Sequence, residues 1–284
     1  MPSTSLLLSA LFAGVVAVLV TLAIERWGGI HGGVLGTVPS TLVPAGLGIW
    51  VATAGDAEQF QRAMGIVPVG LLLNAGFLWL WRIIPGRLPD WRFGVRLTVI
   101  TLITLVAWSA AAVATMVGVG FLLAQGTSSL LIGWLALALG ISIGIATCWK
   151  HVPAPRGDNP VGPRTLVARG LAASLAIGVA VHLAGSGDSL ASGLMSIFPA
   201  IFTTSMVALW ISQGEAVPTG AIGPMMLGAM SVSLYALLIA VFYPMSSSTL
   251  TLAGACVAGW LLAVAGVNLP TWLWLRRRAG IATD

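Results

Sequence analysis

Residues 97–148, LTVITLITLVAWSAAAVATMVGVGFLLAQGTSSLLIGWLALALGISIGIATC, contain no charged side chain. A helix needs about 20 apolar residues to cross the roughly 30 Å of hydrocarbon in a bilayer. The stretch is too long for one such helix, and residues 125–129, QGTSS, supply turn-forming side chains in its middle. It therefore predicts two consecutive membrane spans joined by a short turn.

The composition of the whole chain supports the same interpretation. Of the 284 residues, 7% are charged and 58% are hydrophobic, whereas a soluble domain carries about 25% charged residues. The 35 Gly and 12 Trp residues suit helices that approach closely and aromatic rings that lie at the membrane interface. We expect an all-α transmembrane helix bundle with the lipid bilayer as its main partner.

The basic residues and the cysteines exclude some classes of function. The net charge is +5, but Lys and Arg lie between apolar runs and do not form one wetted surface, so we expect no nucleic-acid binding. Cys148 and Cys256 are too few and too isolated for a disulfide framework or a thiolate metal site. We expect both to be packing residues, and we expect no cofactor.

The charges and turn residues divide the chain into nine apolar runs, which we interpret as nine spans. The first run has no basic residue before it and no clear small-residue cleavage site, so we expect it to be a span and not a removable signal peptide. The predicted spans are Leu6–Ile24, Val34–Thr53, Ala63–Trp81, Leu97–Ala124, Leu130–Cys148, Thr165–Ala184, Leu190–Ser212, Ala221–Tyr243 and Thr249–Trp272.

Nine spans would sort nearly all the basic residues onto one side of the membrane. Only Arg62, accompanied by Asp56 and Glu58, would lie on the other side. Because basic loops stay in the cytoplasm, we expect the N-terminus outside and the C-terminus inside the cytoplasmic membrane. The residues on the basic side are Arg26, Arg82, Arg87, Arg92, Arg96, Lys150, Arg156, Arg164, Arg169, Arg276, Arg277 and Arg278.

The two halves of the chain share a pattern of Gly, Pro and Trp residues at an offset of 160. The segment GVLGTVP and a later Trp in the first half correspond to GLMSIFP and a later Trp in the second. At an offset of 159, an Asn of the first half also corresponds to a Ser of the second half. The pairs are Gly33 with Gly193, Pro39 with Pro199, Trp50 with Trp210, and Asn74 with Ser233.

An odd number of spans makes the two repeats enter the membrane in opposite senses. Spans one to four then pair with spans six to nine, so we predict an inverted-topology repeat of the kind found in many transporters and some channels. We divide the chain into a first repeat at residues 1–124, a connecting helix and cytoplasmic linker at 125–164, and a second repeat at 165–284.

Each half also resembles the GlpM-like family of small four-helix inner-membrane proteins. The resemblance rests on a Gly, five mainly apolar residues and a Pro that open the second span, most clearly in GLMSIFP from Gly193 to Pro199. It implies an inner-membrane protein and supplies no substrate. The fifth span and the linker have no counterpart in that family.

Pro39 and Pro199 predict interruptions of the second and seventh spans, because proline removes a backbone donor and frees a carbonyl. Irregular backbone at this depth must be covered by protein or by a watery cavity. We predict that the neighbouring polar groups line one central substrate site, although Pro kinks and Ser or Thr contacts are also ordinary features of membrane helix packing. The predicted site residues are Pro39, Ser40, Thr41, Asn74, Pro199, Thr203, Thr204 and Ser233.

No charged residue lies near the centre of any predicted span, which disfavours a proton mechanism that uses a buried carboxylate. We expect neutral polar groups to serve a neutral or anionic solute, a lipid-like molecule or sodium. We expect no enzyme, because no nucleophile with a base, no HExxH site and no phosphate-binding loop is present in the sequence.

These features favour a transporter that moves a small solute by alternating access between two repeats. Two alternatives stay open at this point. One is a non-transporting membrane partner of a biosynthetic or export complex, and the other is an ion channel, which the absence of a central ring of charge disfavours.

Overall fold

The protein is all-helical in a computed structural model that describes residues 2–27, 34, 36–149, 162–213 and 216–281. No strand occurs among these residues, which confirms the prediction that the fold is all-α. Some predictions fall on residues outside the described part of the chain. These residues are the repeat position Gly33, the linker residues 151–161, and the basic residues Lys150 and Arg156.

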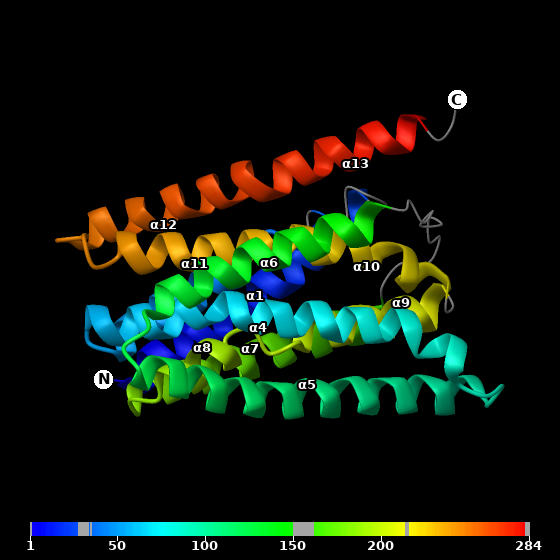
Figure 1. Ribbon diagram of the computed structural model, residues 1–284, viewed down its shortest axis with the longest axis horizontal. Helices are drawn as coiled ribbons and strands as arrows, with labels where there is room; N and C mark the ends of the chain where they lie inside the picture. Colours follow the sequence, from blue (N-terminus) through cyan, green and yellow to red (C-terminus); the bar gives the residue numbers. More distant parts are fainter. Residues whose placement is uncertain (1, 28–33, 35, 150–161, 214–215, 282–284) are drawn as a thin grey trace.

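Figure 1 shows the described helices coloured in chain order. Two of the named elements are not α-helical: η1 is a 3₁₀ turn and η2 is π-helical. In order, the elements are α1 Pro2–Trp27, α3 Leu42–Ala52, α4 Ala57–Ile83, η1 Pro85–Arg87, α5 Phe93–Ala124, α6 Ser129–Trp149, α7 Pro163–Gly185, α8 Ser189–Met195, α9 Ala200–Gln213, α10 Ala216–Gly228, α11 Met230–Phe242, α12 Thr249–Ala263, η2 Val264–Asn268 and α13 Leu269–Ile281.

Seven stretches of helix in the described residues are long and apolar enough to cross a membrane. They include α4, α5, α6 and α7, and the predicted cut between the fourth and fifth spans is confirmed, because Gly126 ends α5 with a positive φ of 86°. Two further apolar helices, Leu6–Leu19 and Leu42–Ala52, are shorter. The count of nine spans therefore stays a prediction.

Three of the predicted spans are interrupted. The second was expected to be helical from Val34, but residues 36–41 form turns and the continuous helix begins at Leu42. The seventh is divided into α8 and α9 by residues 196–199, and the eighth into α10 and α11 at Ala229. Pro39 and Pro199 lie inside the first two interruptions, where the missing N–H of proline disrupts helical hydrogen bonding.

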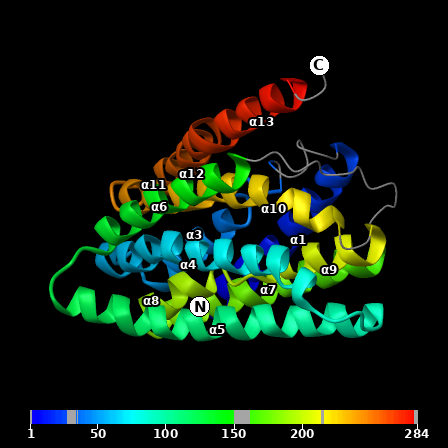
Figure 2. The same ribbon diagram turned by 45° about the vertical axis from the view of Figure 1, so that its right-hand side comes forward.

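The helix α4 runs through the middle of the bundle. In both Figure 1 and Figure 2 it lies between α5 at one edge and the pair α12 and α13 at the other. It packs against α5, α6, α8 and α11, and its burial is among the highest of the candidate spans. The helix α1 packs along α7, where a Cβ at Gly14 would lie 2.8 Å from the carbonyl oxygen of Gly170.

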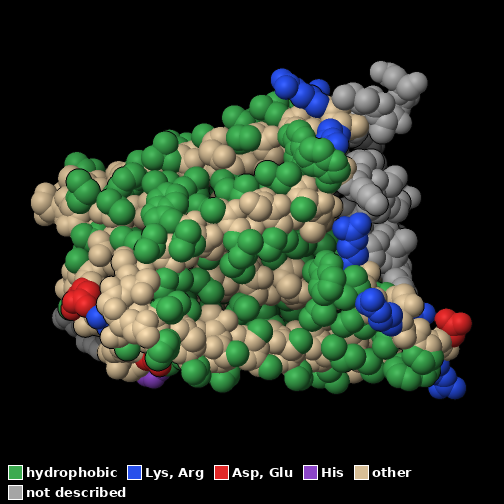
Figure 3. All heavy atoms as spheres, viewed as in Figure 1, with side chains coloured by type: hydrophobic (Ala, Val, Ile, Leu, Met, Phe, Trp, Pro, Cys, Tyr) green, Lys and Arg blue, Asp and Glu red, His purple; other side chains and the backbone are tan. Residues whose placement is uncertain are grey.

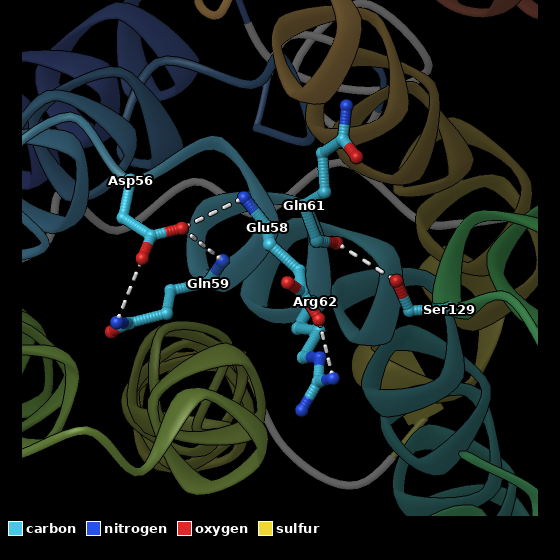
Figure 4. Close-up of polar contacts among 6 residues, drawn as sticks. All are labelled: Asp56, Glu58, Gln59, Gln61, Arg62 and Ser129. Carbon is cyan, nitrogen blue, oxygen red and sulfur yellow. Dashed lines mark hydrogen bonds and ion pairs between the residues drawn. The ribbon is translucent and has the colours of Figure 1, made fainter. Parts of the chain in front are cut away.

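The contact between α4 and α6 depends on two glycines. A Cβ atom at Gly133 would lie 2.5 Å from the carbonyl oxygen of Gly65, and one at Gly65 would lie 2.7 Å from the backbone of Ser129. The backbones therefore touch directly, which is how small residues let membrane helices approach closely. Ser129 adds a hydrogen bond by donating to the carbonyl oxygen of Gln61 at 3.1 Å (Figure 4).

The first turn of α4 is held by polar contacts at one end of the bundle. The carboxylate of Asp56 accepts hydrogen bonds from the backbone N–H groups of Glu58 and Gln59, which caps the helix, and Arg62 pairs with Glu58 at 2.6 Å (Figure 4). The Gln59 N–H is the main reason that the pKa of Asp56 lies below its usual value. This cap is present at neutral pH and is lost as the pH falls through that lowered pKa.

The opposite end of the bundle carries most of the basic side chains. On the face shown in Figure 3, Lys and Arg side chains gather at this end, and hydrophobic side chains cover the middle. Arg278 of α13 lies over the rings of Trp149 and Trp274, at 5.0 and 5.2 Å, and donates to the carbonyl oxygen of Trp149 at 2.9 Å. It thereby caps the C-terminus of α6 and fixes α13 to it.

The glycine contact gives a first prediction. Gly133→Leu should force α6 away from α4 and destabilise the fold by about 1–3 kcal/mol or more, because a well-packed contact has no room for added carbons. Thermal unfolding of the detergent-purified protein measures the loss.

The matched control is Gly118→Leu in α5, where an added Cβ meets nothing within 4 Å. It should leave the unfolding temperature nearly unchanged. Equal effects of the two substitutions would show that the α4–α6 approach does not limit stability.

Candidate functional site

The break between α8 and α9 leaves the carbonyl oxygen of Ile197 without its usual helical partner. The side-chain amide of Asn74, in the middle of α4, donates to this oxygen at 2.8 Å. Trp108 of α5 donates its indole N–H to the amide oxygen of Asn74, also at 2.8 Å. Asn74 thus connects two helices of the first half to the break in the second half, and Trp108 also packs edge-on against Phe198 at 5.2 Å.

The break before α3 is held by three elements of the second half. Ser231 of α11 donates to the carbonyl oxygen of Thr37 at 2.9 Å and lies 2.8 Å from that of Gly228. The amide nitrogen of Asn268, in η2, lies 3.3–3.4 Å from the Val34 and Gly228 carbonyl oxygens and the Thr37 hydroxyl. A side chain at Gly228 would collide with Thr37, so glycine is required at the end of α10.

The two clusters have the same plan. In each, a helix break in one half of the chain is tied to side chains from two elements of the other half: α4 and α5 in the first cluster, α11 and η2 in the second. Ile197 corresponds to Thr37 and Trp108 to Asn268 at the offset of 160 seen in the sequence. By its contacts, the counterpart of Asn74 is Ser231, two residues before the Ser233 that the sequence offset indicated.

Aromatic contacts repeat this cross-connection. Trp50 of α3 lies edge-on against Tyr243, which follows α11, with ring centroids 6.0 Å apart. Its sequence counterpart Trp210 of α9 lies edge-on against Trp81 of α4 at 5.7 Å. Such edge-to-face pairs are favourable beyond the area they bury.

Two predicted site residues, Thr203 and Thr204, form hydrogen bonds within their own helix. The hydroxyl of Thr203 donates to the Pro199 carbonyl oxygen at 2.7 Å, and that of Thr204 donates to the Ala200 carbonyl oxygen at 2.9 Å. Both bonds stay within α9, where hydroxyls commonly satisfy themselves on the preceding turn.

The remaining predicted residues occupy varied positions. Pro39 and Pro199 are buried within the breaks, and Ser40 and Thr41 are half-buried just before α3. The Ser233 hydroxyl is fully buried in α11, and it has no hydrogen-bond partner among the described residues.

Three side chains from outside the broken segments were not predicted as site residues: Trp108, Ser231 and Asn268. Asn268 had a signal in the sequence, because it is a lone amide in an apolar span at 160 residues from Trp108. Ser231 had none that separates it from other serines. The hydrogen bonds of both clusters come from neutral amide, hydroxyl, indole and carbonyl groups, and no group of three or more His, Cys, Asp or Glu side chains in the described residues could hold a metal ion.

Comparison with known proteins adds no identity. No protein-family model matches the chain, and no curated protein and no solved structure matches it. The resemblance of each half to the GlpM-like family therefore stays an interpretation of the sequence.

The Asn74 cluster gives a second prediction. Asn74→Leu should destabilise the protein by about 1–2 kcal/mol, because it leaves the Trp108 N–H and the Ile197 carbonyl without partners in hydrocarbon. Trp108→Phe, which keeps a ring against Phe198, should cost a similar amount. Because the two groups share one bond, the double substitution should cost less than the sum. Equilibrium unfolding in mixed micelles provides the three values, and strict additivity would exclude the coupling.

Proposed function

We propose that this protein is a membrane transporter that moves a small solute by alternating access between two inverted repeats. The observation that carries the proposal is the pair of broken spans, each held by side chains of the opposite half of the chain. Broken helices at the repeat interface are where many secondary transporters bind substrate and coupling ions. The site would lie between the segments 36–41 and 196–199 and the helices α4 and α11.

Three features support two similar halves of opposite orientation. The helices α1 and α7, which would be equivalent, pack antiparallel, with Val18 near Gly170 and Leu6 near Gly178. The equivalent α4 and α11 are also antiparallel, since Gln61 near the start of α4 donates to Ala240 near the end of α11 at 3.2 Å. Third, exchanging the two halves would place each polar cluster on the other, and each aromatic pair on the other.

The ion channel and the non-transporting partner remain alternatives. The tied breaks favour a transporter over a channel, because the described central residues form packed hydrogen bonds and not a ring of like charges. A stable protein that co-purifies with this chain at fixed stoichiometry, without binding of any small molecule, would favour the partner role.

The proposal includes the orientation with the N-terminus outside and the C-terminus in the cytoplasm. Alkaline phosphatase is active only outside the cytoplasm. Green fluorescent protein fluoresces only when it stays in the cytoplasm, because it does not mature after export in the unfolded state. A fusion after Asp284 should therefore fluoresce, and a phosphatase inserted at Gly187 should be active. Reversed or same-side results at these two positions would contradict the assigned topology.

Alternating access can be tested before the substrate is known. Spin labels would be attached to two pairs of positions, one pair at each end of the bundle, in a variant that lacks Cys148 and Cys256. The pairs are Gln59 with Ser186 at the end that carries Asp56, and Gly86 with Arg164 at the basic end. In lipid nanodiscs each pair should give two distances, and conditions that lengthen one should shorten the other.

A single distance at both ends, unchanged across a metabolite library, would oppose the transporter proposal. The same library, screened by thermal shift on the purified protein, identifies ligands because a bound ligand stabilises the folded state by mass action. Uptake of any ligand found would then be measured in proteoliposomes.

A further inference from the structure

We infer that the cluster around Thr37 is a binding site for a monovalent cation, with Na⁺ the best fit. The cluster lies at the meeting point of three irregular segments: the turns before α3, the interruption between α10 and α11, and the π-helical η2. Breaks in membrane helices free backbone carbonyls, and such carbonyls coordinate Na⁺ in transporters. A π-helical turn often marks a functional position as well.

The cluster holds more oxygen acceptors than it has protons to pair with them. The single hydroxyl proton of Ser231 faces two carbonyl oxygens, those of Thr37 at 2.9 Å and Gly228 at 2.8 Å. The Thr37 hydroxyl and the Thr37 N–H both donate to the Val34 carbonyl oxygen, at 2.8 and 3.2 Å. The two amide protons of Asn268 face that oxygen, the Thr37 hydroxyl oxygen and the Gly228 carbonyl oxygen, all at 3.3–3.4 Å, which is long for a hydrogen bond. The amide oxygen of Asn268 has no partner among the described residues. A cation would satisfy the surplus of lone pairs.

The distances from the Asn268 amide suit a small cation, whereas the Thr37 hydroxyl and Val34 carbonyl oxygens lie closer together, at 2.8 Å, because they share a hydrogen bond. Turning the Asn268 amide by 180° places its oxygen 3.3–3.4 Å from the Val34 carbonyl, the Thr37 hydroxyl and the Gly228 carbonyl. Ligands at right angles around a cation with bonds of about 2.3–2.6 Å lie about 3.3–3.7 Å apart, a bond range given for Ca²⁺ that also holds for the similarly sized Na⁺. The larger K⁺ needs its ligands farther apart.

The charge of the site selects a monovalent ion. All of these ligands are neutral, and the side chains are buried: Thr37 is 4%, Ser231 0% and Asn268 3% exposed. A divalent ion takes carboxylate ligands to offset its charge. A monovalent ion needs less compensation and can be held by carbonyl dipoles.

The equivalent cluster at Asn74 has the opposite balance, which makes it an internal control. There the Asn74 amide nitrogen donates to Ile197 and the Trp108 indole donates to the Asn74 amide oxygen, each at 2.8 Å, so both ends of the amide have a close partner. We assign the Asn74 cluster to structure and the Thr37 cluster to cation binding. The role of Na⁺ as a coupling ion rests on the proposed transport function, whereas the claim that Na⁺ binds here does not.

The test is binding of radioactive ²²Na⁺ to the purified protein, together with thermal unfolding as NaCl replaces choline chloride at constant ionic strength. The wild-type protein should bind Na⁺ saturably and unfold at higher temperature in Na⁺ than in K⁺ or choline. Thr37→Val and Ser231→Ala should lower the affinity for Na⁺ by about 10- to 100-fold or more, the range found when a group that merely supports a metal ligand is lost. Asn268→Asp should raise it, because it adds a carboxylate.

The matched control is Thr104→Val in α5, a fully buried threonine whose hydroxyl bonds to its own helix at 2.8 Å. It and Trp108→Phe should keep the Na⁺ response. An unfolding temperature for the wild-type protein that is equal in Na⁺, K⁺ and choline would overturn the site, as would an unchanged response in folded Ser231→Ala. Neither result would bear on the proposed transport, which the spin-label distances test. Conversely, those distances could contradict alternating access while Na⁺ still binds.

Discussion

Backbone groups that a broken helix releases in hydrocarbon must find partners within the protein, because no water is there to provide them. This constraint acts at residues 36–41 and 196–199, where turns replace helix in the middle of apolar segments. The partners come from the other half of the chain in both cases: Asn74 for Ile197, and Ser231 for Thr37. In the folded protein each half therefore supplies the hydrogen-bond donor for a carbonyl in the other half's break.

The packing around the breaks follows from this mutual dependence. The central helix α4 must approach α8 and α11 closely enough for side chains as short as Asn and Ser to reach carbonyl groups. Small residues permit that approach: a Cβ at Gly193 would collide with the backbone of Ala63, and one at Gly70 would collide with Ile197. The crossing helix α6 uses Gly133 in the same way against α4.

The two breaks are alike in architecture and differ in chemistry. At Asn74 the amide nitrogen and the amide oxygen each form one short hydrogen bond, so both ends of this side chain have a partner within the protein. At Thr37 the oxygens outnumber the protons and the amide contacts are long. If the halves exchange conformations, one break would serve as the fixed connection and the other as the position that an ion stabilises.

The sequence alone determined the membrane class, the helical fold, the turn at Gly126 and the interruptions at Pro39 and Pro199, because length, apolarity and the missing proline N–H are local properties. It also located Asn74 as a polar residue that needs a partner. Only the tertiary structure decided which partner, since Ile197 lies 123 residues away and its free carbonyl is a property of the backbone that no side-chain pattern encodes. For the same reason the sequence indicated Ser233, whereas Ser231 forms the bond. The two serines lie within one turn of α11, and the packing of that helix decides which of them faces the Thr37 carbonyl.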